Sequence, residues 1–190
     1  DQIQQPDRLQ ARAAVRKPFG GFATGTGDVL LFNLQNRKNI GLAVGLDVAP
    51  RMMQFGREKA ARQGLAERVQ FVQGDALALP FADSSFDVVT ISFGIRNVTD
   101  VPRALSEMHR ILHPGGQALI LEFSFPRNRV LRSAYLVYLR HVLPRIGGLL
   151  SGDAIPYQYL DKTVESFPYG KAFCDLMTAA GFAEADQQPL

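Results

Sequence analysis

The chain has 190 residues, of which 46% are hydrophobic and 21% charged, and this length and composition suit one globular domain with a sizeable core. Its net charge of +3 is only mildly basic, so it gives no reason to expect a nucleic acid as partner, although it is compatible with an anionic surface. The single cysteine, Cys174, excludes an internal disulfide, and its apolar neighbours predict a buried helical position. No apolar run approaches ~18 residues, so we expect no spanning helix, no signal peptide and a soluble or peripheral protein. No metal site is expected, because the three histidines lack metal-ligand spacing: His109, His113 and His141.

The first 18 residues are polar and basic and predict a terminal helix or arm. The segment that follows is awkward, because a glycine loop of the kind described next needs a buried strand of ~4–8 residues before it. Residues 17–22 contain Pro18, Gly20 and Gly21, which makes them too short and too rich in strand breakers. We therefore expect that residues are missing from the numbering just before Phe22.

The loop Ala23–Asp28 is the first candidate site. Gly25 and Gly27 permit a positive φ and a close approach of the backbone to a ligand, and the amphipathic run that begins at Val29 predicts the first turns of a helix. A dinucleotide fingerprint would require a third glycine where Leu30 stands. Asp28 would repel a pyrophosphate and attract a cation, so the loop favours the sulfonium of S-adenosylmethionine. A nucleotide site and a structural turn are the alternatives.

The remainder of the chain alternates strand and helix patterns. We predict strands at residues 40–47, 69–73, 86–92 and 117–123. We predict helices at residues 50–62 and 100–112, the second of which is ended by a turn at residues 113–116. Such alternation predicts an α/β fold with a doubly wound, mostly parallel sheet, in which ligands bind outside the carboxyl ends of the strands.

Three polar side chains end these strands. Asp47 is suited to accept both ribose hydroxyls, and its alternative role is to cap the helix that Pro50 opens. Asp75 could bond an adenine amino group while the backbone N–H of Ala76 meets a ring nitrogen; its alternative is a turn aspartate. Ser92 could face the cofactor or be an ordinary hydroxyl at a strand end.

Several segments resemble a known family, the S-adenosylmethionine-dependent quinone C-methyltransferases of ubiquinone and menaquinone biosynthesis. The general methyltransferase features are the glycine loop, the acid at residue 47 and the segment 74–81. The narrower motifs are ISFGIRNVTD at 91–100, LEFS at 121–124, HVLPRIG at 141–147, YQYL at 157–160, FP at 167–168 and AGF at 180–182. The resemblance covers residues 22 to 185.

This resemblance implies a class I, Rossmann-like methyltransferase fold and S-adenosylmethionine as co-substrate. It also implies a prenylated quinol as acceptor and a place in the cytoplasm, at the inner face of the cytoplasmic membrane. The cofactor contacts that it implies lie at the loop and strand ends: Gly25, Thr26, Gly27, Asp47, Asp75, Ala76 and Ser92. It leaves open a benzoquinol or a naphthoquinol ring, and a monomer or a homodimer.

Two departures from the family pattern qualify this. Gly21 stands where the family has an aspartate, which supports missing residues, and the chain ends at Leu190 before the family's final strands, so we expect the sheet to lack an edge. The predicted organisation is a single domain, with an arm at 1–21, a cofactor-binding core at 22–125, a substrate lid at 126–160 and a C-terminal helix and strand at 161–190.

The lid is the part that the general fold does not explain. A helical projection of residues 130–143 gathers Arg129, Arg132, Ser133 and Arg140 in one arc and leaves mostly apolar side chains elsewhere. One interpretation is a packed helix with a solvated basic face. The other is a helix that shelters a polyprenyl quinol at a membrane, with its arginines near anionic headgroups.

Methyl transfer to a ring carbon needs a phenolate, because a neutral quinol carbon is a poor nucleophile. Arg96 follows the strand that ends at Ser92, so we predict that its guanidinium stabilises the phenolate and that Asn97 orients the acceptor. His141 is the second candidate, as a direct base. The alternatives are an ion pair for Arg96 and a packed lid position for His141. For the whole chain, the alternatives are a methyltransferase acting on a sterol, a phenol or a soluble acid, or a non-catalytic cofactor-binding scaffold.

Overall fold

The computed structural model describes residues 17–126, 128–143, 145–146, 163–164 and 167–188. Residues 1–16 of the predicted arm, the YQYL motif and most of the second half of the predicted lid therefore lie outside the described residues. The chain forms two compact units: the first comprises Asp1–Glu122 and Ala179–Phe182, and the second comprises Phe123–Thr178 and Ala183–Leu190. Each unit is described by itself, and the predicted single domain with its inner boundaries stays a prediction.

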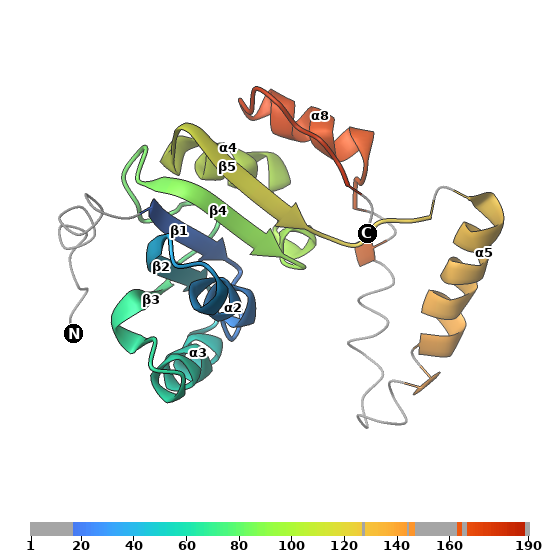
Figure 1. Ribbon diagram of the computed structural model, residues 1–190. Coiled ribbons are helices and arrows are strands. Elements are labelled where there is room, and N and C mark those ends of the chain that lie inside the picture. Colours follow the sequence, from blue (N-terminus) through green and yellow to red (C-terminus); the bar gives the residue numbers. More distant parts are fainter. Residues whose placement is uncertain (1–16, 127, 144, 147–162, 165–166, 189–190) are drawn as a thin grey trace. The chain divides into compact units, whose positions relative to one another are not determined.

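The first unit is built on a parallel sheet of five strands in the order β3-β2-β1-β4-β5 (Figure 1). The strands are β1 (Lys17–Phe22), β2 (Ile40–Asp47), β3 (Val69–Gln73), β4 (Phe86–Ser92) and β5 (Leu112–Leu121). The chain reverses its direction of travel across the sheet between β3 and β4, so the predicted doubly wound α/β fold is confirmed. In such a sheet the crevice for a ligand lies at the carboxyl ends of the strands beside this reversal, here β1 and β4.

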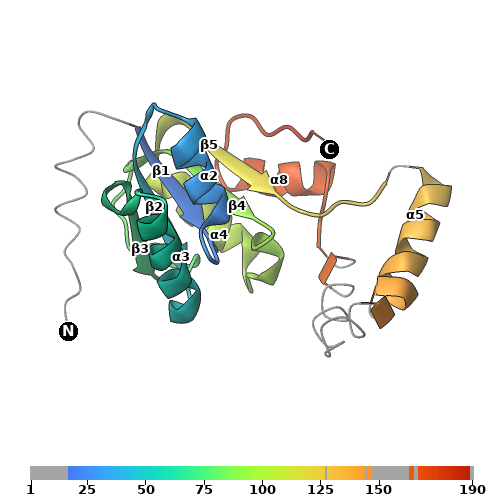
Figure 2. The ribbon, with the colours of Figure 1, turned by 60° about the horizontal axis from the view of Figure 1, so that its bottom comes forward.

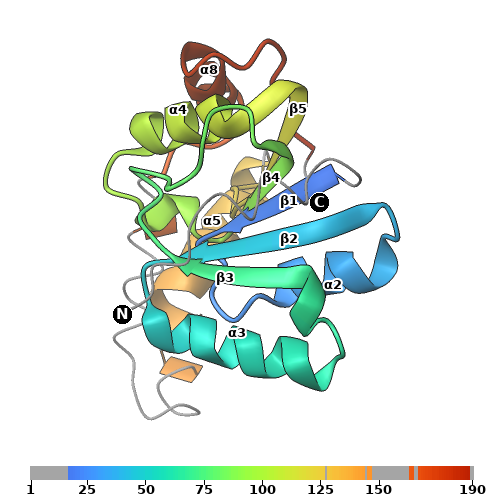
Figure 3. The ribbon, with the colours of Figure 1, turned by 90° about the vertical axis from the view of Figure 1, so that its left-hand side faces the viewer.

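Helices cover both faces of this sheet. α2 (Asp28–Asn36) and α3 (Pro50–Arg62) lie on one face and α4 (Val101–Ile111) on the other, as right-handed crossovers require (Figure 3). Asp100 caps α4 by accepting from the backbone N–H of Arg103 at 3.0 Å, and Gly64, with φ of 69°, follows α3. Two short 3₁₀ turns complete the unit, η1 (Ala66–Arg68) and η2 (Ile95–Asn97).

The prediction that residues 17–22 are too short and too rich in strand breakers to form the strand before the glycine loop was wrong. They form β1 without a break, and β1 pairs in parallel with β2 on one side and with β4 on the other. Its glycines make room for neighbouring side chains, since a Cβ at Gly20 would lie 3.1 Å from Phe22 and a Cβ at Gly21 would lie 3.1 Å from Leu30. The central strand is therefore narrow where large residues pack against it, and it needs no missing residues before Phe22.

The fifth strand also differs from its prediction, which was residues 117–123 after a turn. β5 begins at Leu112 and ends at Leu121, and its register against β4 shifts between the pairs Phe86↔Leu112 and Val88↔Gln117. The predicted turn residues are thus an irregularity inside the strand, where Gly115 has φ of 80°.

The core of this unit has one apolar layer on each face of the sheet. On the face of α2 and α3, Leu30, Leu34, Met53 and Phe71 are buried together. On the other face the rings of Phe22, Phe81 and Phe86 pack with centroids 5.1–6.3 Å apart. Phe81 lies in the connection between β3 and β4, so this ring cluster ties that connection to the sheet.

The second unit contains α5 (Arg129–Val137), a π-helical turn η3 (Tyr138–Val142) and nearly all of α8 (Lys171–Ala179). Phe125, Leu139 and Val164 form its small buried core, and the Arg132 guanidinium lies 5.1 Å from the Phe125 ring centroid. Cys174 is helical as predicted, but it is only half-buried. Among the described residues, no helix combines the length and apolarity that crossing a membrane requires.

Candidate functional site

The glycine loop is a tight turn from β1 into α2 (Figure 2). Ala23, Gly25 and Gly27 have φ of 45°, 53° and 77°, and the Gly27 N–H donates to the Thr24 carbonyl at 2.8 Å. A Cβ at Gly27 would lie 2.9 Å from the Phe71 ring, so this position has no space for a side chain. The predicted loop geometry is confirmed, with backbone rather than side chains facing outward at Gly25.

Asp47 fastens this loop to the end of β2. Its Oδ2 accepts from the Gly25 N–H at 2.8 Å and its Oδ1 accepts from the Ala49 N–H at 2.9 Å, just before α3. Ala49 is the N-cap residue of α3 and no side chain caps this helix, so Asp47 does not play the capping role that was its alternative. A carboxylate has about four lone-pair directions, so two remain for ribose hydroxyls, and the predicted role stays a prediction.

We expected Asp28 to present a free negative charge to a ligand, but its carboxylate is paired. Lys59 of α3 binds Asp28 Oδ1 at 2.6 Å and donates to Thr26 Oγ1 at 3.1 Å, while the Thr26 hydroxyl donates to Asp28 Oδ2 at 2.6 Å. The Lys59 ammonium, followed by the Thr26 hydroxyl, lowers the pKa of Asp28. The carboxylate is thus neutralised locally, and Thr26 is held in place by α3.

A pocket of about 220 Å³ opens at the carboxyl ends of β1 to β4. Its walls include four of the predicted site residues, Asp47, Asp75, Ala76 and Asn97, together with Ala23, Leu46, Val48, Gly74, Leu77, Gly94, Val98 and Thr99. Gly25, Thr26, Gly27, Ser92 and Arg96 are not among the lining residues. The loop nevertheless reaches the pocket through the bond of Gly25 to Asp47.

Asp75 also makes turn contacts. Its Oδ1 accepts from the Leu77 N–H at 2.9 Å, and its carbonyl accepts from Ala78 at 3.1 Å. The structure therefore contains the alternative turn aspartate, with the side chain exposed at the pocket wall. The assignment of Asp75 and Ala76 to an adenine ring stays a prediction.

Arg96 forms the ion pair that was its alternative. Its Nη1 lies 2.6 Å from Glu122 Oε1 and donates to the Phe93 carbonyl at 2.8 Å, and the two charged side chains are only 11% and 8% exposed. Phe93 follows Ser92 with φ of 55°, an uncommon conformation for a bulky residue. Sequence reasoning missed Glu122, although it lies in the quoted LEFS motif beside the end of β5.

His141 lies in η3 of the second unit, where it is exposed and not packed in a core. Its role as a base stays a prediction. In the described parts of the chain, no group of three or more histidine, cysteine or acidic side chains is arranged to hold a metal ion.

The pocket fits part of S-adenosylmethionine. At about 220 Å³ it is smaller than the roughly 300 Å³ lower end of pockets that enclose a drug-sized ligand, so it suits one half of the molecule rather than all of it. Its walls offer carboxylates and backbone groups suited to ribose and adenine, and the adjoining loop leaves its backbone accessible, since a Cβ at Gly25 would meet nothing within 4 Å.

The parallel sheet and the helices on its two faces form the class I, Rossmann-like fold of S-adenosylmethionine-dependent methyltransferases. A solved S-adenosylmethionine-dependent methyltransferase from Aquifex aeolicus shares the fold, with a TM-score of 0.54 and 18% identity over 66% of this chain and 67% of that one. The chain belongs to the ubiE/COQ5 methyltransferase family, whose sequence model matches residues 10–190. The resemblance seen in the motifs is thereby confirmed.

Two relatives carry this further. The chain is 47% identical over 161 residues to a demethylmenaquinone methyltransferase of Thermus thermophilus, covering 85% of this chain and 72% of the relative. It is 43% identical over 184 residues to a ubiquinone/menaquinone biosynthesis C-methyltransferase of Dinoroseobacter shibae, covering 97% of this chain and again 72% of the relative.

Proposed function

We propose that this protein transfers the methyl group of S-adenosylmethionine to a ring carbon of a prenylated quinol. The observation that carries the proposal is the pocket at the strand ends. Asp47 and Asn97 line this pocket, and Asp47 also bonds the glycine loop. The names of the two relatives support the acceptor class, since both act in quinone biosynthesis or on demethylmenaquinone.

The cofactor supplies an electrophilic methyl group on a sulfonium, so the chain needs no nucleophile of its own. Its task is positioning, because holding two reactants in near-attack geometry contributes about 7–11 kcal/mol in favourable cases. Asp47 and the Asp75–Ala76 pair would hold the adenosine half, and the loop at Gly25, Thr26 and Gly27 the remainder. Ser92, at the end of β4, would lie beside the cofactor.

On the acceptor side, Arg96 would stabilise the phenolate and Asn97 would orient the ring. Glu122 and the Phe93 carbonyl fix the Arg96 guanidinium, so its donors are preorganised and need little reorganisation when charge develops. A guanidinium stays protonated and cannot be a simple base. His141 is the second candidate for taking up the proton.

The second unit would bring the protein to an anionic membrane. α5 exposes Val130, Leu131 and Val137 at 77%, 59% and 56%, next to the exposed Arg129, and this combination is typical of interfacial helices. Arg132 has another role as well, since it packs over the rings of Phe125 and Tyr169. Replacing Arg129 and Arg140 should weaken flotation with anionic vesicles, and rising salt should weaken it for the parent. Binding that is indifferent to both changes would leave the arc as a solvated face.

The function itself is tested by methyl transfer from labelled S-adenosylmethionine to demethylated prenyl benzoquinols and naphthoquinols, beside a panel of sterols, phenols and soluble acids. Preferential labelling of a prenyl quinol is the expected result, and the preferred ring decides between the two quinol classes. Labelling of a soluble acceptor alone would point to another small-molecule methyltransferase. Cofactor binding without transfer to any acceptor would point to a scaffold.

A further inference from the structure

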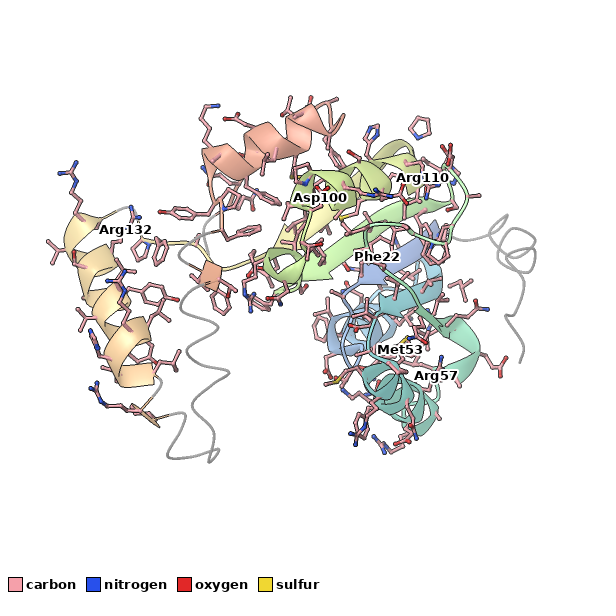
Figure 4. All side chains as sticks on the ribbon, turned by 180° about the vertical axis from the view of Figure 1, so that it is seen from behind. Phe22, Met53, Arg57, Asp100, Arg110 and Arg132 are labelled. Carbon is pink, nitrogen blue, oxygen red and sulfur yellow. The ribbon has the colours of Figure 1, made fainter. Side chains whose placement is uncertain are left out.

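Side chains on one face of α4 form hydrogen bonds with the connection between β3 and β4. Arg103, Glu107 and Arg110 lie at positions i, i+4 and i+7, so they share one side of the helix. We call these three residues the α4 clamp. Figure 4 labels Asp100 near the beginning of α4 and Arg110 near its end, so the clamp runs along most of the helix.

The clamp bonds the backbone of residues 77–81 at four points. Arg103 Nε donates to the Leu77 carbonyl at 2.8 Å, and Glu107 Oε2 accepts from the Leu79 N–H at 2.8 Å. Further along, Arg110 donates to the carbonyls of Leu79 at 3.0 Å and Phe81 at 2.9 Å. Charged side chains thus provide hydrogen bonds that a neighbouring strand would otherwise supply.

The two distal members of the clamp also bind one another. Arg110 Nε and Nη2 each lie 2.8 Å from a Glu107 carboxylate oxygen, which is a bidentate pair, and Arg110 Nη1 reaches Asp83 Oδ1 at 2.7 Å. Arg110, followed by the Leu79 N–H, lowers the pKa of Glu107, and Glu107 and Asp83 raise the pKa of Arg110. The Glu107–Arg110 pair is therefore held by several hydrogen bonds, and both of its members stay charged near neutral pH.

The residues whose backbone the α4 clamp bonds, 77–81, follow directly in sequence on those of the pocket wall. Asp75, Ala76 and Leu77 line the pocket, and Leu77 is bonded to Asp75 by its N–H and to Arg103 by its carbonyl. Leu79 is only 4% exposed, so the segment is also anchored by an apolar side chain. The position of the Asp75–Ala76 turn at the pocket is thus tied to bonds made two to six residues after Asp75.

We propose that the α4 clamp is a positioning element for the adenosine half of the cofactor. It touches no ligand itself; it fixes the backbone that carries Asp75 and Ala76. This inference rests on the proposed assignment of that pair to the adenine. It adds to that assignment three residues, on the far side of the connection, that set how well the pair can bind.

The test compares Arg110→Lys, which keeps the charge but loses the planar fork, and Glu107→Gln with the parent. A matched control is Lys171→Met, which removes an exposed ion pair with Asp175 in the second unit. Calorimetry would measure binding of S-adenosylhomocysteine and of 5′-methylthioadenosine, which lacks the amino-acid half. Hydrogen exchange of residues 74–81 would be followed without ligand.

We expect both clamp variants to bind both ligands on the order of tenfold more weakly, with faster exchange at residues 74–81 and an unchanged control. An equal loss for both ligands places the effect in the adenosine half. Binding within twofold of the parent while the segment exchanges faster would overturn the proposal, as would a loss seen only for S-adenosylhomocysteine. Because no acceptor is present, a clamp that behaves as expected beside absent methyl transfer would refute the proposed function alone.

Discussion

Replacing Arg96 by methionine is the sharpest test of the acceptor side, because it separates a structural from a catalytic role. The substitution leaves Glu122, 8% exposed, without the guanidinium now 2.6 Å from its carboxylate, and it also removes a bond to the Phe93 carbonyl. Breaking one side of a buried ion pair costs about 3–5 kcal/mol. We expect a loss of about 3 kcal/mol in the free energy of unfolding, at the lower end because Arg96 retains 11% exposure.

The double variant Arg96→Met with Glu122→Gln removes both charges. It should recover much of that stability, because a neutral amide in the same place costs less to bury than a carboxylate. Urea unfolding measures the recovery, and Glu122→Gln alone completes the double-mutant cycle.

Activity is then compared among folded variants at saturating cofactor. If Arg96 stabilises the phenolate, the double variant stays slow although it is stable again, and its deficit shrinks as pH rises and the acceptor loses its proton unaided. Parental turnover in the stable double variant would refute the electrostatic role and leave Arg96 as a structural residue. A parallel profile of His141→Gln that retains the parental acid limb would remove that histidine as the base.

Three further predictions concern the pocket and its supports. Gly94→Ala should lower the free energy of unfolding in urea by about 1–3 kcal/mol, because its Cβ would lie 2.5 Å from the Ala23 Cβ. Adding Ala23→Gly should restore stability, since residue 23 has φ of 45°. A Gly94→Ala variant as stable as the parent would contradict this packing. Asp47→Ala should weaken S-adenosylhomocysteine binding at least tenfold in calorimetry, and parental affinity would make the ribose assignment wrong. Because its pKa is lowered in the folded protein, the ionised Glu107 stabilises the fold at pH values above its ordinary pKa of 4.5. This stabilisation is lost as pH falls through the lowered pKa, so Glu107→Gln should flatten the acid limb of thermal stability. An unchanged limb would show that other carboxylates govern it.

The strands and helices that follow one clear period could be predicted closely from the sequence. β2, β3, β4 and α3 have the predicted bounds because each is an apolar run or an amphipathic stretch with a glycine or proline at its border. β1 was missed for the opposite reason. In a central strand flanked by Leu30 and Phe86, glycines are tolerated because large neighbours fill the space, and this is a property of the packing and not of the segment.

The candidate site was predictable to the level of strand ends and no further. Topology alone brings Asp47, Asp75, Ala76 and Asn97 to one pocket, so a correct reading of the alternation was sufficient for them. The partners of the site residues were not predictable, because Glu122 reaches Arg96 across 26 positions and Lys59 reaches Asp28 across 31. Contacts of this separation depend on the register of neighbouring strands and helices, which a local pattern does not contain.

The ion pair between Lys59 and Asp28 leaves other residues to set the charge of the candidate site. Lys59 neutralises Asp28, whose side chain is 72% exposed, so solvent and the ammonium together weaken its field at the loop. Among the described residues, neither Asp47 nor Asp75 lies in an ion pair, and both line the pocket. The pocket therefore carries two carboxylates. Backbone N–H groups donate hydrogen bonds to them but do not cancel their charge. Such a wall suits the hydroxyls and amine of adenosine, so we expect the strand ends, and not the acid of the glycine loop, to contribute most to binding the adenosine half of the cofactor.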